Sequence, residues 1–174
     1  MMLFYVIMAL IVMICAFILS VYGYLTYMKF RQRRLWDELY AQLKIKYGFV
    51  TDMLDIVKDI YPHESEALKI LAGCLNAFIS SRTPLETAAA YTKTQTALHG
   101  LDVLLDKYPL VRSRDAYVSL KDEMISVDEK IAFASQFYND SAGAFNARLS
   151  KLPFKAVAGI FNIGAKGRLE FKRQ

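Results

Sequence analysis

The residues that could perform chemistry are few, and their spacing does not fit a metal site. His63-Glu64 resembles the start of a helical zinc motif, but that motif needs a second histidine four residues later, where the chain has Ala67. The other histidine, His99, falls on a different predicted helix. We therefore expect both histidines to be solvated or capping residues, and we expect no metal ion and no cofactor.

Acidic pairs are the second feature that could carry chemistry. Carboxylates cluster at Glu64 with Glu66, at Asp122 with Glu123 and at Asp128 with Glu129. Di-metal sites in helical bundles use Glu-x-x-His pairs on facing helices, and the chain has no such pair. Solvated helix faces explain these carboxylates.

Nucleophile and phosphate-binding patterns are also missing from the sequence. Ser80, Ser81 and Ser141 have no neighbouring histidine to act as a base, and the C-terminal glycines Gly159, Gly164 and Gly167 lack the Walker and dinucleotide spacings. Cys74 falls on an apolar stretch, where packing is its expected role. We therefore predict that the protein is not an enzyme, and the residue inventory does not support a cryptic metal-dependent enzyme.

The dominant feature is the start of the chain, because residues 1–28 carry no charged side chain. A helix of this length is about 42 Å long, and a hydrocarbon core is about 30 Å thick. No basic residue precedes the apolar run, which argues against a cleaved signal peptide. The pattern predicts one retained transmembrane helix over residues 1–28, with Tyr22, Tyr24 and Tyr27 in the interfacial aromatic belt.

Four basic residues follow this segment at once: Lys29, Arg31, Arg33 and Arg34. Cytoplasmic flanks of membrane helices are enriched in lysine and arginine, so we expect the N-terminus outside and the rest of the chain in the cytoplasm. The alternative is that these residues only mark the headgroup zone, whichever side of the membrane they occupy.

The distribution of charge favours lipid over nucleic acid as a partner. The chain carries a net charge of +5, of which residues 1–34 contribute +4 and residues 153–174 another +4, so the stretch between carries −3. Nucleic-acid binders usually carry positive charge on the folded body, whereas basic segments beside a bilayer attract anionic lipids. The two cysteines, Cys15 and Cys74, are too differently placed to pair, which agrees with a reducing compartment.

Beyond Arg34, apolar residues recur at steps of three and four without strand-like alternation. This predicts an all-α protein, in which a single N-terminal transmembrane helix leads into an elongated antiparallel bundle of about four long helices. We expect the anchor at 1–28, the bundle at 29–152 and a basic C-terminal tail at 153–174. The predicted core stripes are Trp36, Leu39, Leu43, Tyr47, Val50, Leu54, Val57 and Tyr61; Leu68, Leu71, Leu75 and Phe78; Ala90, Leu98, Leu101 and Leu105; and Leu120, Met124, Val127, Ile131, Ala134, Tyr138, Ala142, Phe145 and Leu149.

Local signals set the helix ends. Thr83 is the expected N-cap of the third helix, with Pro84 at its first position and Glu86 completing a capping box. The first bundle helix contains Gly48 and meets Pro62, and the sequence leaves open which of the two breaks it.

An even number of helices returns the chain toward the membrane. The basic tail, which has apolar residues among its charges, then lies near the headgroups. We hypothesise that residues 153–171 touch the membrane surface, with capping of the end of the bundle as the alternative.

Two aromatic-asparagine pairs, Tyr138-Asn139 and Phe145-Asn146, repeat seven residues apart and share a helix face. They could form a polar face for a partner or a sister helix. Alternatively, they could form hydrogen bonds inside the bundle and set its register.

The run from Val127 to Asp140, VDEKIAFASQFYND, resembles the ENKIAFARQFYND motif of the LemA family of bacterial membrane proteins. The endings Leu152-Pro153, Val157–Phe161 and Leu169–Phe171 are similar to the FP, IAGIF and YFE of that family, and Gln42–Tyr47 resembles its QLKRRY. Ser135 stands where the family usually has arginine.

The resemblance implies a single-pass protein of the bacterial inner membrane with a short outer N-terminus and a helical bundle, and it supplies no catalytic residues. Our leading hypothesis is a membrane-anchored scaffold or adaptor whose partners are lipid and either another protein or further copies of itself. The alternative is a lipid-surface or membrane-remodelling protein that acts through its basic ends.

Overall fold

Helices make up nearly all of the chain that the computed structural model describes, which comprises residues 1–60, 65–106, 115–169 and 171. They are α1 (Met2–Ile60), α2 (Ser65–Ser80), α3 (Pro84–Leu105), α5 (Asp115–Leu149) and the short α6 (Phe154–Ile160). The described part of the chain contains no strand, as the sequence predicts. The all-α expectation is confirmed.

Contacts divide the chain into two compact units. Unit 1 comprises Met1–Leu35 and Tyr138–Arg168, and unit 2 comprises Trp36–Phe137 and Leu169–Gln174. Helices α1 and α5 each contribute to both units.

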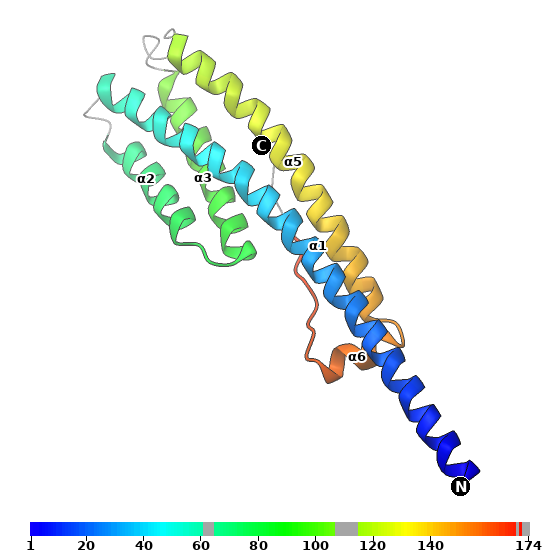
Figure 1. The fold of residues 1–174 in the computed structure, drawn as a ribbon. Coiled ribbons are helices and arrows are strands. Elements are labelled where there is room, and N and C mark those ends of the chain that lie inside the picture. The colour runs from blue at the N-terminus through cyan, green and yellow to red at the C-terminus, as the bar shows by residue number, and fades with distance from the viewer. Residues whose placement is uncertain (61–64, 107–114, 170, 172–174) are drawn as a thin grey trace. The chain divides into compact units, whose positions relative to one another are not determined.

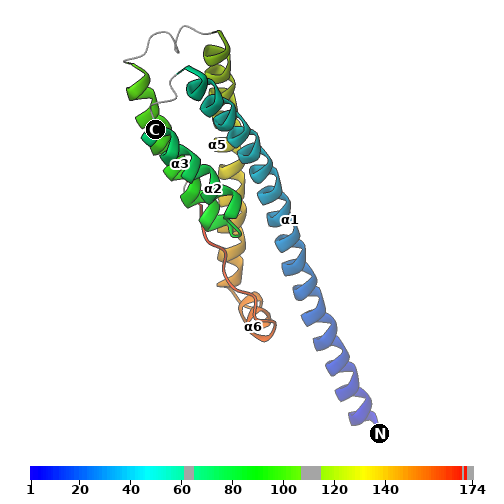
Figure 2. The same cartoon turned by 90° about the vertical axis from the view of Figure 1, so that its left-hand side faces the viewer.

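Unit 2 is an antiparallel four-helix arrangement. Figures 1 and 2 show α2 turning back along α1, α3 reversing alongside α2, and α5 reversing again. All four helices supply side chains to one core, because each presents one apolar stripe that only its neighbours can cover. The buried members are Val50, Met53, Leu54 and Val57 from α1, Leu68 and Leu71 from α2, Leu98, Leu101 and Leu105 from α3, and Tyr117, Leu120 and Met124 from α5.

The possible break at Gly48 does not occur, because α1 is helical through this position to Ile60. Leu43, Tyr47 and Val50 are all buried, so the apolar stripe holds the helix together across the glycine. Trp36 and Ala134, two members of the predicted stripes, are only half-buried. Tyr61 and Pro62 lie outside the described residues.

The hairpin of α2 and α3 has the predicted cap. The Glu86 N–H donates to Thr83 Oγ1, and the Glu86 carboxylate accepts from the backbone N–H groups of Thr83 and Arg82. These bonds satisfy amides that have no partner within the helix. They also hold the pKa of the Glu86 carboxyl below its ordinary value.

Unit 1 has its own small core. Val21 and Leu25 of α1 pack with Phe145 of α5, and with Val157, Ala158 and Ile163 of the segment around α6. The sequence predicts a tail over residues 153–174, whereas the structure has the short helix α6 within it. The short helix is stabilised because Val157 and Ala158 pack against the apolar side chains of Val21, Leu25 and Phe145.

Candidate functional site

The first turns of α1 expose their apolar side chains to the surroundings. Between Met1 and Ser20 every residue except Ile18 is exposed, including Leu3, Phe17 and Leu19 at 74%, 55% and 65%. Burial begins only at Val21 and Leu25. Among the described residues, this is the one helix long and apolar enough to cross a membrane by length and composition.

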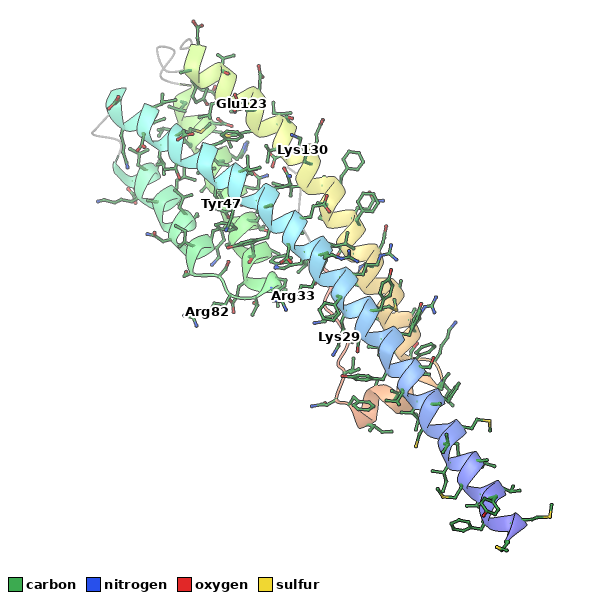
Figure 3. All side chains as sticks on the ribbon, viewed as in Figure 1. Lys29, Arg33, Tyr47, Arg82, Glu123 and Lys130 are labelled. Carbon is green, nitrogen blue, oxygen red and sulfur yellow. The ribbon has the colours of Figure 1, made fainter. Side chains whose placement is uncertain are left out.

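The predicted basic residues follow this stretch on α1. Lys29, Arg31, Arg33 and Arg34 are all exposed, and Figure 3 shows Lys29 and Arg33 beyond the apolar end of the helix. Exposed cations at this place can meet anionic headgroups without desolvation of a buried charge.

The predicted aromatic belt contacts the C-terminal segment. The ring centroids of Tyr22 and Phe161 are 4.4 Å apart, and those of Tyr24 and Phe154 are 5.6 Å apart. The Arg148 guanidinium lies 4.9 Å from the centroid of the Tyr24 ring, within cation–π range. The residues around α6 are thus held against the part of α1 where its exposed apolar stretch ends.

The face formed by Tyr138, Asn139, Phe145 and Asn146 is engaged mainly within the chain. Tyr138 and Phe145 are buried, and burial raises the pKa of the Tyr138 phenol. Asn146 bonds the backbone of Lys166 at two points, while Asn139 is half-buried. These contacts favour a role in packing and register, and a partner role for this face stays a prediction.

A buried charge network in unit 2 was not foreseen. Lys46, whose side chain is 1% exposed, donates to Asp128 Oδ1 at 2.5 Å and lies 4.9 Å from the Tyr91 ring centroid. The Tyr91 hydroxyl donates to the same Asp128 oxygen at 3.0 Å, and Gln95 Nε2 donates to the Tyr91 hydroxyl at 2.8 Å. Phe171 meets the Tyr91 ring edge-on at 5.3 Å.

Burial sets the protonation of this network. It lowers the pKa of the Lys46 ammonium, against the raising effect of Asp128. It raises the pKa of the Tyr91 phenol, and the Asp128 charge adds to that effect. Burial thus favours the protonated form of the Tyr91 phenol and opposes the charge of the Lys46 ammonium, which Asp128 partly offsets.

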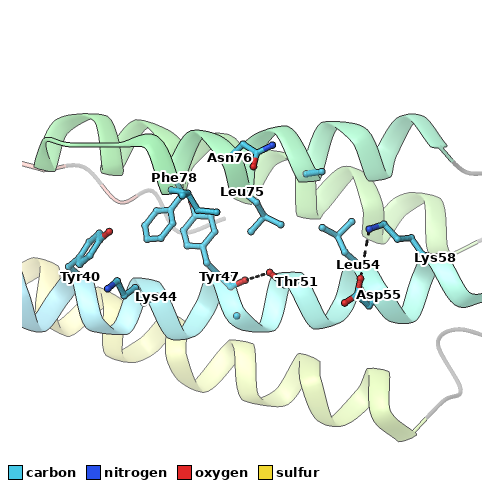
Figure 4. A pocket seen from close by; sticks show the side chains of 13 residues that line it. Tyr40, Lys44, Tyr47, Thr51, Leu54, Asp55, Lys58, Leu75, Asn76 and Phe78 are labelled. Atoms are coloured by element: carbon cyan, nitrogen blue, oxygen red, sulfur yellow. Dashed lines mark hydrogen bonds and ion pairs between the residues drawn. The ribbon is translucent and has the colours of Figure 1, made fainter.

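An aromatic groove lies between α1 and α2 (Figure 4). Tyr47 stacks on Phe78 with centroids 3.6 Å apart, and Tyr40 stacks on the same ring at 5.7 Å. The Tyr47 hydroxyl is hydrogen-bonded to Thr94 at 2.9 Å, and burial raises its pKa to about 12. Lys58 and Asp55 form an exposed ion pair on the rim, which contributes little to stability.

The residues weighed for metal chemistry do not gather in the part of the chain that the structure describes, where no group of three or more metal-ligating side chains occurs. His63 and Glu64 lie outside that part. Cys15 and Cys74 are both free, and burial raises the pKa of the Cys74 thiol.

Comparison with known proteins identifies the family. The chain matches the sequence model of the LemA family over residues 35–174, which is most of its length. The chain belongs to the LemA family. Its similarity to individual characterised proteins covers a shorter stretch, which spans about a quarter of the length of those relatives.

These similar proteins carry magnetosome names. The Magnetosome protein MamQ of Magnetospirillum gryphiswaldense is 30% identical over 64 residues, covering 37% of this chain and 24% of that protein. MamQ 1 and MamQ 2 of Paramagnetospirillum magneticum are 28% identical over 64 residues, with the same coverage.

The LemA motif can now be placed on α5. Ile131 and Tyr138 of the motif are buried, whereas Phe133 and Phe137 are 65% and 61% exposed. The buried members satisfy the core of the chain itself. The two exposed phenylalanines, four residues apart on one helix, leave an apolar pair that packing within the chain does not require.

Proposed function

We propose that this LemA protein is a non-catalytic, membrane-anchored scaffold or adaptor. One helix holds it in the bacterial inner membrane, with the N-terminus outside. A four-helix bundle on the cytoplasmic side offers a surface to a protein partner or to further copies of the chain.

One observation carries this proposal: the change in exposure along α1. Up to Leu19 the helix is apolar and, apart from Ile18, exposed. Further along the same helix an apolar stripe that includes Leu39, Leu43 and Val50 is buried. Exposed apolar surface of this extent is unfavourable in water and favourable in lipid. The same helix therefore serves as anchor and as bundle member.

Phe133 and Phe137 support the second half of the proposal. They are large, exposed and apolar, and they belong to the LemA motif of α5. Aromatic side chains are enriched at the centres of protein interfaces. The similarity to magnetosome proteins fits a membrane-linked role and does not define the partner.

Photocrosslinking in native membranes tests the scaffold role. We would place a photoreactive phenylalanine analogue at Phe133 or Phe137, and at exposed Glu123 of α5 as the matched control. The expected result is an adduct with another polypeptide from position 133 or 137 and none from 123. If none of the three positions gives an adduct with another polypeptide, although the protein is recovered from membranes, the scaffold role is wrong.

The charges at the end of the anchor test the orientation. Replacing Lys29, Arg31, Arg33 and Arg34 by alanine removes the asymmetry that retains this flank in the cytoplasm. The assay uses a variant that lacks both natural cysteines and carries one cysteine in the bundle. With the four basic residues in place, we expect this cysteine to be protected from an impermeant thiol reagent in intact cells. With the four alanines, we expect a fraction of the molecules to be labelled. Labelling of the variant that keeps the four basic residues, in intact cells, would show the opposite orientation.

A further inference from the structure

We propose that residues 150–161 form an interfacial element that lies in an anionic headgroup layer beside α1, with Leu152 and Ile160 reaching the hydrocarbon. This inference rests on the proposed membrane anchoring and adds a second membrane contact to it. Four observations within unit 1 support it.

The first observation is the position of α6 along the anchor. The exposed apolar stretch of α1 ends near Ser20, and about 20 residues of helix span about 30 Å, the thickness of a hydrocarbon core. Val157 and Ala158 pack in one cluster with Val21 and Leu25, directly after that stretch. The geometry therefore places α6 at the level of the headgroups.

The second observation is the exposure of the element itself. Val157 and Ala158 are buried against α1, but Leu152 is 79% exposed, Ile160 is 69% exposed and Phe161 is 43% exposed. Three large apolar side chains within ten residues are costly in water, and each is favourable when buried in lipid. Packing within unit 1 leaves Leu152 and Ile160 largely uncovered, whereas Phe161 also contacts the Tyr22 ring.

The third observation is charge. Unit 1 contains nine basic residues and one acidic residue, Asp140, which gives it a net charge of +8, whereas the whole chain carries +5. Lys151 and Lys155 flank the exposed apolar residues and are themselves exposed. Basic residues near a membrane surface are attracted to anionic lipid headgroups. The concentration of positive charge in this unit matches an anionic surface.

The fourth observation is that the element is held in place. Asn146 bonds the backbone N–H and C=O of Lys166, and Ile163 is buried in the core of unit 1. Residues 150–161 are therefore anchored at both ends, to α5 and to the returning segment. A fixed element can present its apolar side chains to lipid without the entropy cost of folding on binding.

Quenching of tryptophan by brominated lipids tests the inference on the full-length protein. In a Trp36→Phe background, single tryptophans are introduced by Ile160→Trp, by Phe17→Trp as a reporter of the anchor, and by Phe133→Trp as a control on the bundle. The vesicles contain phosphatidylglycerol and phosphatidylcholine brominated close to the headgroup. Leu152→Trp is a second reporter if Ile160→Trp alters the helix content measured by circular dichroism.

We expect quenching at positions 160 and 17 and none at 133. Quenching at 17 without quenching at 160 or 152 overturns the interfacial element and leaves the anchor intact. Absence of quenching at 17 overturns the anchoring itself, and the inference with it. Equal quenching at 160 and 133 also overturns the inference, because contact would then not be confined to this element.

Charge reversal tests the anionic lipid requirement. We expect Ile160→Trp to be quenched more strongly in vesicles with phosphatidylglycerol than in pure phosphatidylcholine. Lys151→Glu with Lys155→Glu should abolish this difference, whereas Lys44→Glu with Lys58→Glu, two exposed lysines of unit 2, should preserve it. An equal loss in both double variants, or no lipid dependence at all, contradicts a role for these two lysines.

Discussion

Asn146 on α5 holds the backbone of Lys166 with both ends of its side-chain amide. Nδ2 donates to the Lys166 carbonyl at 2.7 Å, and the Lys166 N–H donates to Oδ1 at 2.8 Å. A primary amide supplies a donor and an acceptor in one plane, which matches the two groups of a peptide backbone. This contact ties the returning segment to the end of α5.

Removing the amide should loosen that segment. Asn146→Leu loses both bonds and Asn146→Asp loses the donor, at a cost of about 1 kcal/mol per bond. We expect limited trypsin digestion to cut faster at Lys166 and Arg168, in the order Leu, Asp, natural sequence. Gln136→Leu, a polar-to-apolar change at an exposed site on the same helix, serves as the control. Unchanged cleavage in Asn146→Leu would mean that the bonds do not hold the segment.

The Lys46–Asp128 pair should respond unequally to the loss of each partner. Asp128→Ala leaves a buried ammonium without its carboxylate and should destabilise the protein by about 3 kcal/mol. Lys46→Met should cost less. The Asp128 carboxylate keeps its hydrogen bond from the Tyr91 hydroxyl, and the Asp128 side chain is 23% exposed. We expect the double variant to be more stable than Asp128→Ala alone. Chemical denaturation of the detergent-solubilised chain, followed by circular dichroism, measures these differences, and equal costs would contradict the argument.

Gly48→Ala should stabilise the bundle. Gly48 is exposed in the middle of α1, and a Cβ placed there meets no atom within 4 Å. Glycine in a helix interior costs up to about 1 kcal/mol relative to alanine, so the midpoint of denaturation should rise. Gly100→Ala, near the end of α3 and equally open, is the matched comparison and should gain less. A fall in stability would mean that α1 bends at Gly48 in solution.

Tyr47 should make stability fall at alkaline pH. Its pKa is about 12 in the folded protein and about 10 when unfolded, so the folded state binds more protons between these values. The contribution of Tyr47 to the free energy of unfolding is complete below pH 10 and is lost as the pH rises through about 12. The lowered pKa of Lys46 has the opposite effect, adding stability as the pH rises toward 10.5, so the measurement belongs in a Lys46→Met background. Tyr47→Phe should flatten the decline between pH 10 and 12; an unchanged slope would contradict it.

Much of the fold could be predicted from local pattern. Leu39, Leu43, Val50 and Val57 lie at helical spacing, and all four are buried. The third helix begins where its capping signals predict. Such features depend on residues within a few turns of one another, which a sequence displays directly.

The less predictable features depend on residues far apart in the chain. Lys46 continues the α1 stripe, three residues after Leu43 and four before Val50, but its burial requires Asp128, which is 82 residues away. The repeated aromatic-asparagine pair draws attention to Asn146, but the partner of its side chain is a backbone group 20 residues later. Spacing alone could have suggested that Lys46 faces the core, and only the structure supplies its counter-ion.

The burial of Lys46 has a practical consequence when it is compared with its neighbour Lys44. Lys44 is exposed on the same helix, whereas the Lys46 ammonium is enclosed and bonded. Amine acylation by a water-soluble reagent should modify Lys44 readily and reach Lys46 only in molecules whose bundle has opened. The ratio of the two adducts, read by mass spectrometry within one peptide, thus measures the open population of the bundle in isolated membranes.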